Sequence, residues 1–180
     1  MPSDDRGRQP VLISVGGLPA TGKTTVARSL AMTLRGAYVR IDTVETAIGT
    51  AEGRFADTNG WEHPPGYLVG YAVASDQLRN GIHVVAESVN AGEATRIAWR
   101  DTGLQASARF LDVEIVCSDP IEHRRRAEER VVDVVGLELP SWDQIRDREY
   151  APWERDRLVV DTAVLNVDES VELIRATIET

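Results

Sequence analysis

Eight residues near the start of the chain have the types and spacing of a phosphate-binding loop. Residues 17–24 read GLPATGKT and fit the pattern G-x-x-x-x-G-K-[ST]. Glycines let such a loop curl until successive backbone N–H groups face a bound phosphate. The Lys23 ammonium could then reach the outer phosphates, and the Thr24 hydroxyl could ligate Mg²⁺. The segment therefore predicts binding of ATP with its metal ion.

The predicted nucleotide contacts extend from the first glycine of this pattern to the residue after it. They are Gly17, Leu18, Pro19, Ala20, Thr21, Gly22, Lys23, Thr24 and Thr25. Lys23 is the only lysine among the 20 basic residues of the chain. A rigid guanidinium does not replace an ammonium freely inside a tight loop, so we interpret Lys23 as a functional residue. The alternative is an ordinary glycine-rich turn with an exposed lysine.

The loop requires a strand before it and a helix after it, and the sequence supplies both. The apolar run 11–17 is typical of a strand buried on both faces. In the segment 23–36, Val26, Leu30 and Leu34 recur every four residues, which predicts an amphipathic helix that stops near Gly36.

Further strands and helices alternate along the rest of the chain. Strands are predicted over 37–42, 82–87, 110–117 and 157–162, and helices near 44–48, 67–78, 93–105 and 120–130. Two more helices are predicted, one that starts after Ser141 and a final one that starts after Asp168. Asp119, Ser141 and Asp168 are predicted N-caps of the last three helices. This alternation predicts an α/β fold with a mostly parallel sheet and helices on both faces. Ligands collect at the carboxyl ends of such strands, where Gly17, Asp42 and Glu87 fall.

Two carboxylates at these strand ends are candidates for chemistry. Glu87 stands where an acidic residue could support Mg²⁺, so Thr24 and Glu87 are the predicted metal ligands. A base facing the acceptor and a surface glutamate are the alternatives for Glu87. Asp42 could accept the proton of a substrate hydroxyl, could cap the following helix, or could do both.

Arginines and aromatic residues complete the candidate site. Arg126 and Arg130 are four residues apart on one helix face and could stabilise charge on a transferring phosphoryl group. A solvated, salt-bridged helix face is the alternative. The residues predicted to contact an acceptor are Asp42, Arg54, Trp61, Tyr67, Asn90 and Arg148.

With these features in this order, the chain resembles the small-molecule branch of the P-loop kinases. That branch includes shikimate, gluconate and adenylylsulfate kinases, chloramphenicol phosphotransferase and zeta-toxin-like ATPase domains. The resemblance implies a three-layer fold, a five-stranded parallel sheet of order 2-3-1-4-5, ATP with Mg²⁺, and a lid. It also implies a lid role for Arg126 and Arg130 and an acceptor-side role for Asp42. The chain departs from the family in having Glu87 in place of the usual Asp, and in an apolar lid segment, VVDVVGLELP, at 131–140.

Composition limits the partners and the compartment. The chain has 180 residues and a net charge of −9, which argues against a nucleic-acid partner. No apolar run reaches the length of a membrane span, and a single cysteine is typical of a reducing compartment. We expect a cytoplasmic protein with one domain over 1–180. Its parts would be a polar leader at 1–10, an acceptor region near 43–80 and a lid region near 124–150.

The predicted function is an ATP-dependent phosphotransferase, a small-molecule kinase. It would move the γ-phosphate of ATP to a hydroxyl of a metabolite or an antibiotic-like compound, with Lys23, Asp42, Arg126 and Arg130 as catalytic residues. A regulatory ATPase without a small-molecule acceptor and a nucleoside monophosphate kinase are the alternatives.

Overall fold

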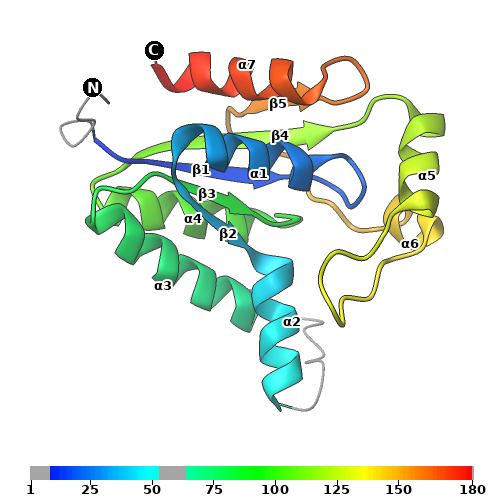
Figure 1. Cartoon of the computed structure of the whole chain (residues 1–180), viewed down its shortest axis with the longest axis horizontal. Helices are drawn as coiled ribbons and strands as arrows, with labels where there is room; N and C mark the ends of the chain where they lie inside the picture. The colour runs from blue at the N-terminus through cyan, green and yellow to red at the C-terminus, as the bar shows by residue number, and fades with distance from the viewer. Residues whose placement is uncertain (1–8, 53–63, 180) are drawn as a thin grey trace.

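The computed structural model of the chain describes residues 9–52 and 64–179, and within them a parallel sheet forms the centre (Figure 1). Its order, β2-β3-β1-β4-β5, confirms the order that the family resemblance implied. The strands are β1 (Val11–Gly16), β2 (Ala37–Arg40), β3 (Val84–Glu87), β4 (Arg109–Val116) and β5 (Leu158–Asp161). Their parallel direction brings the segments that follow them to one edge of the sheet.

Helices cover both faces of the sheet, as predicted. They are α1 (Lys23–Leu34), α2 (Ile41–Glu52), α3 (Pro65–Arg79), α4 (Glu93–Gln105), α5 (Pro120–Glu129), α6 (Trp142–Arg146) and α7 (Val167–Glu179). One apolar core lies between the sheet and α1 with α7, and a second lies between the sheet and α3 with α4. Figure 1 shows α7 on one side, α3 and α4 on the other, and α5 and α6 beyond the strand ends.

The position of β1 at the centre of the sheet explains its unbroken apolar sequence. Val11, Ile13 and Val15 belong to the core under α1 and α7, whereas Leu12 belongs to the core above α3 and α4. Side chains alternate across a strand, so a strand with a helix layer on each face needs apolar residues at successive positions.

The predicted boundary between the second strand and the helix after it is wrong by two to three residues. The second strand ends at Arg40 and α2 begins at Ile41, so Asp42 lies in the first helical turn and not at the strand end. The chain passes from strand into helix without a loop, and an acidic residue in a first turn interacts favourably with the helix dipole.

Asp168 is not the N-cap of α7, because Asn166 takes that role. The Asn166 Oδ1 accepts the N–H of Glu169 at 3.0 Å, and the Glu169 carboxylate accepts the N–H of Asn166 at 2.9 Å. This reciprocal pair needs an acceptor three residues after the cap. Asp168 is followed at that distance by the apolar Val171. The predicted caps at Asp119 and Ser141 are confirmed.

Gly17 is the point of closest backbone approach between the loop after β1 and β4. Its φ is +142°, and a Cβ there would lie 2.3 Å from the Ile115 carbonyl oxygen. Any side chain would therefore both strain the backbone and push β1 away from β4.

We expect Gly17→Ala to lower the free energy of unfolding by more than about 2 kcal/mol, because the cost of backbone strain adds to that of steric overlap with β4. Gly103→Ala is the matched control, because its Cβ would meet Phe110 and Leu12 at ordinary distances of 3.4 and 3.5 Å inside α4. That control should be neutral or stabilising by up to about 1 kcal/mol. Urea unfolding of both variants measures the difference, and equal stabilities would contradict the expectation.

Candidate nucleotide and acceptor site

The loop between β1 and α1 has the backbone of an anion-binding turn. Gly22 is left-handed with φ of +93°, and Ala20 is left-handed with φ of +64°. The Thr21 hydroxyl donates to the Leu18 carbonyl at 2.9 Å, which holds the loop closed on itself. No side chain caps the N-terminus of α1, so the positive end of this helix is available to a phosphate.

Glu87 is held beneath this loop by two hydroxyl groups. The side chain is 1% exposed, which rules out a surface glutamate. Its Oε1 accepts the Thr24 hydroxyl at 2.6 Å, and its Oε2 accepts the Tyr38 hydroxyl. Burial and the neighbouring carboxylate raise the pKa of Tyr38, so this phenol stays protonated and remains a donor. Tyr38 was not among the predicted site residues.

The oxygen atoms of Thr24 and Glu87 suit Mg²⁺, which prefers hard oxygen ligands. Among the described residues, no group of three or more His, Cys, Asp and Glu side chains could hold a metal ion without help. Mg²⁺ is often bound through one or two protein ligands together with substrate phosphates. The donor set therefore fits an ion that arrives with a nucleotide and does not fit a permanent metal cage.

Lys23 is buried among carboxylates at the start of α1. Its side chain is 3% exposed. Burial lowers the pKa of the ammonium, and the charges of Glu87 and Asp42 act in the opposite direction. An ammonium held in this way is desolvated, so its attraction to a phosphate oxygen is stronger than in bulk water.

A cavity of about 670 Å³ opens beside Lys23, and it brings together six of the predicted residues. Its lining comes from the phosphate loop, α2, α3, the β3–α4 connection and residues 130–149. Predicted residues on its wall are Pro19, Lys23, Asp42, Tyr67, Arg130 and Arg148. Arg54 and Trp61 lie outside the described residues.

Asn90, which was expected to contact an acceptor, does not line this cavity. Its side chain is fully buried, donates to the Ser14 hydroxyl at 3.0 Å and accepts from the Ser88 hydroxyl at 2.7 Å. Its backbone N–H donates to the hydroxyl of Tyr67 at 3.3 Å. Asn90 therefore joins β1 to the loop after β3. Its backbone is left-handed, with φ of +51°, and its side chain contacts buried polar groups instead of the cavity.

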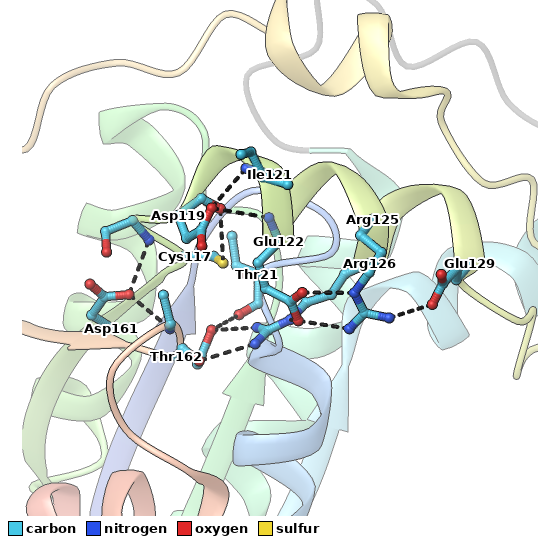
Figure 2. A network of polar contacts seen from close by, with 12 residues as sticks. Thr21, Cys117, Asp119, Ile121, Glu122, Arg125, Arg126, Glu129, Asp161 and Thr162 are labelled. Carbon is cyan, nitrogen blue, oxygen red and sulfur yellow. Dashed lines mark hydrogen bonds and ion pairs between the residues drawn. The ribbon is translucent and has the colours of Figure 1, made fainter.

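Arg126 is not among the residues that line the cavity. Figure 2 shows it pointing toward Thr162, next to Thr21 of the phosphate loop. It donates to the Thr162 hydroxyl at 2.8 Å, and that hydroxyl donates to the Thr21 carbonyl at 2.6 Å. Glu122, one turn earlier in α5, accepts hydrogen bonds from Arg125 and Arg126. Arg126 thus connects α5 to the loop through Thr162.

Arg40 is a central residue that the sequence analysis missed. Its side chain is 3% exposed and lies 3.8 Å from Glu87, 3.6 Å from Asp42 and 2.7 Å from Asp133. The strand register pairs Arg40 with Glu87. Alternation along β2 places Tyr38 and Arg40 on the same face, and this was the available signal.

Asp133 attaches the connection between α5 and α6 to α1 and β2. Asp133 pairs with Arg28 of α1 at 3.1 Å and with Arg40 at 2.7 Å. Apolar residues around it divide into two sets. Val131 and Val135 are 82% and 96% exposed, whereas Leu137, Leu139 and Pro140 line the cavity.

We expect Asp133→Asn to loosen this connection and to raise the rate of Glu-C endopeptidase cleavage after Glu138 by about three- to tenfold. The reason is that both ion pairs of Asp133 are lost at once. Asp143→Asn is the control, because its ion pair with Arg146 is exposed on α6. Equal cleavage of the two variants would show that Asp133 does not hold the connection.

Arg96 fixes the far wall of the cavity. This buried guanidinium donates to the carbonyls of Asn90, Pro152 and Ala151 at 2.8 to 2.9 Å. It also lies 4.1 Å from the ring centroid of Trp153. The segment that carries Arg148 is thereby attached to the loop after β3. In the sequence, Arg96 lies within an amphipathic helix pattern, and nothing in that pattern predicts this role.

Comparison with known families agrees with this geometry. Residues 12–152 match the AAA_33 family model, described as an AAA domain. The chain belongs to this family. A search among curated proteins gave no match.

Solved structures show the same fold across nearly all of this AAA-domain chain. A provisionally assigned kinase from Chloroflexus aurantiacus is 22% identical with a TM-score of 0.72, covering 96% of this chain and 97% of that one. The APS kinase CysC of Mycobacterium tuberculosis, in complex with AMPPNP and APS, is 18% identical with a TM-score of 0.69 over 96% and 99%. Kti12 of Chaetomium thermophilum, in complex with ADP-AlF3, is 19% identical with a TM-score of 0.65 over 92% and 97%.

These likenesses establish a P-loop kinase fold for the chain. Within the described residues, none of the helices is both long enough and apolar enough to cross a membrane.

Proposed function

We propose that the protein transfers the γ-phosphoryl group of ATP to a hydroxyl group of a small molecule. The observation that carries this proposal is the single cavity shared by Lys23, Asp42, Arg130 and Arg148, directly beside the Thr24–Glu87 pair. Phosphoryl transfer needs few reacting protein groups but requires close positioning and positive charge around the phosphates. The cavity supplies both, and it leaves room for an acceptor.

On the donor side, the loop amides and Lys23 would bind the phosphates of ATP. Thr24 and Glu87 would hold Mg²⁺, which when bound neutralises charge on the β- and γ-phosphates. Arg126 and Thr162 would keep the outer side of the loop in place for the nucleotide. Arg130 makes no ion pair with the described residues and would be free to pair with the transferring phosphoryl group.

On the acceptor side, Asp42 would orient the attacking hydroxyl and take its proton. A new bond would form between the hydroxyl oxygen and the γ-phosphorus, and the bond from the γ-phosphorus to the bridging oxygen would break, which releases ADP. The proton would leave Asp42 for solvent after product release. Tyr67 and Arg148 would shape the far end of the pocket.

The fold likeness to APS kinase, a structure that contains AMPPNP and APS together, supports a site with room for nucleotide and acceptor. The single cysteine supports a cytoplasmic location. A net charge of −9 supports a small acceptor over a nucleic acid.

The test is ATP consumption by the purified chain against a library of hydroxyl-bearing metabolites and antibiotics, with the product identified by ³¹P NMR. We expect ADP release to require one acceptor class and a phosphate ester to appear. Hydrolysis at the same rate with every acceptor and with none would overturn the proposal in favour of a regulatory ATPase. Transfer confined to nucleoside monophosphates would identify a nucleoside monophosphate kinase instead.

A further inference from the structure

Charge is distributed unevenly along the cavity. Its cationic groups Lys23 and Arg130 lie at the phosphate end. Beyond them the wall carries acidic side chains from four segments and a single arginine, Arg148. The acidic residues are Asp42, Glu45, Glu93, Glu138 and Glu149. The described wall beyond the phosphate end is therefore mainly acidic.

Within the part of the chain that the structure describes, most of these carboxylates have no cation of their own. Glu93 is an exception, because it lies 3.7 Å from Arg96 and 3.6 Å from Arg155. In contrast, Glu45, Glu138 and Glu149 have no ion pair within 4.0 Å among the described residues, and Asp42 shares Arg40 with two other carboxylates. When the phosphates of ATP occupy Lys23 and Arg130, Arg148 would be the one cation among the described lining residues left to face them.

Asp42 and Glu45 form the centre of this acidic wall. They are three residues apart in α2 and therefore lie on one face of the helix. The Glu45 side chain is packed on the start of α3, since a Cβ at Gly66 would lie 2.1 Å from the Glu45 Cγ. A neighbouring cavity of about 250 Å³ is also lined by Asp42, Glu45 and Glu138, so these three carboxylates face both cavities.

The pKa of Glu45 is raised, as expected of a carboxyl group that has no paired cation. Burial raises the pKa of this carboxyl to about 7, the charge of Asp42 adds to the rise, and Arg148 acts against it. A bound ammonium would favour the ionised form and remove the repulsion from Asp42. A bound carboxylate or sulfate would increase that repulsion.

We propose that the acceptor is a hydroxyl compound that also carries an ammonium group, such as an aminosugar or an aminocyclitol. This inference rests on the proposed function. The hydroxyl to be phosphorylated lies at Asp42 and the ammonium at Glu45, with Glu138 contacting the cation from the α5–α6 connection. Side chains three residues apart on a helix are about 5–6 Å apart at their Cβ atoms, so the two groups belong on neighbouring or next-neighbouring carbons.

Acceptors matched in size but different in charge provide the test. Glucosamine, glucose and glucuronate form one series, and 2-deoxystreptamine with myo-inositol forms another. With ATP and Mg²⁺, we expect ADP release and a ³¹P ester signal from the amine members only. A neutral or anionic member that is phosphorylated while the amines are not would overturn the ammonium proposal and leave the kinase proposal standing. Acceptor-independent hydrolysis throughout would overturn both.

Variants then locate the ammonium. Glu45→Gln should raise the KM for the amine acceptor at least about tenfold and change kcat by less than about threefold, because the lost contact is a binding contact. Glu138→Gln, from a different segment, should also raise this KM, which keeps the test valid if Glu45→Gln folds poorly. Glu128→Gln, on the exposed face of α5, is the matched control and should change neither constant. An unchanged KM in both test variants would overturn the assignment.

Discussion

Replacing Lys23 with arginine should reduce kcat/KM for ATP turnover by at least about 100-fold, although the substitution keeps the positive charge. The side chain is buried, and the charges of Glu87 and Asp42 act on it. A planar guanidinium is wider, and its fixed fork cannot follow the phosphate oxygens as a rotatable ammonium can. It would displace Thr24 or Asp42, or would remain outside the loop.

The measurement pairs steady-state ADP release with binding of a fluorescent ATP analogue. Arg175→Lys, the opposite exchange on the far helix α7, is the control and should leave both unchanged. Turnover near that of the unaltered chain in the Lys23→Arg variant would mean that the only lysine of the sequence stands in the loop by chance. Weak binding combined with a normal thermal unfolding midpoint would place the defect in the loop itself.

The donor side of the site could be predicted because its signals are local. The phosphate loop is one continuous segment, and the strand and helix around it have strong apolar patterns. Glu87 was found for the same reason, since it directly follows a short apolar strand. The sheet order came from the family resemblance and not from the residue pattern, because strand order depends on long-range pairing that one sequence does not reveal.

The residues that the sequence did not reveal act through contacts between distant segments. Thr162 supports the loop from 141 positions away, as the hydroxyl that bonds Thr21. Arg40 could have been suspected from alternation in β2, but its partner Asp133 lies 93 positions later in an irregular connection. The prediction that Asn90 contacts an acceptor did not hold, because a polar residue after a strand can face either the ligand or the sheet. The sequence does not reveal the left-handed backbone found at this position.

The acceptor side was the least predictable part because four separate segments build it. No single segment carries a motif, and the acidic wall emerges only when α2, α4 and residues 138–149 are brought together. Glu45 illustrates this well. In the sequence it is an ordinary helical glutamate, whereas in the fold it is packed on Gly66 beside Asp42 with no cation within ion-pair distance among the described residues.

Asp42→Asn should lower kcat for phosphoryl transfer by about 100-fold or more, which is the typical effect of removing a positioned base. Asparagine keeps the size and can still orient a hydroxyl, but it cannot take the proton. ATP binding should stay within about twofold, because the role proposed for Asp42 concerns the acceptor and not the nucleotide. The combination of normal binding and slow transfer distinguishes a base from a structural residue of the first turn of α2.

Single-turnover transfer to an amine acceptor measures this effect, with Asp76→Asn on the exposed surface of α3 as the control. Full transfer by Asp42→Asn would exclude Asp42 as the base and would leave Glu45 as the nearest remaining carboxylate on the same helix face. The double variant Asp42→Asn with Glu45→Gln then separates the two roles. If Asp42 takes the proton and Glu45 holds the ammonium, the double variant combines slow transfer with a raised KM, because the two defects affect different steps.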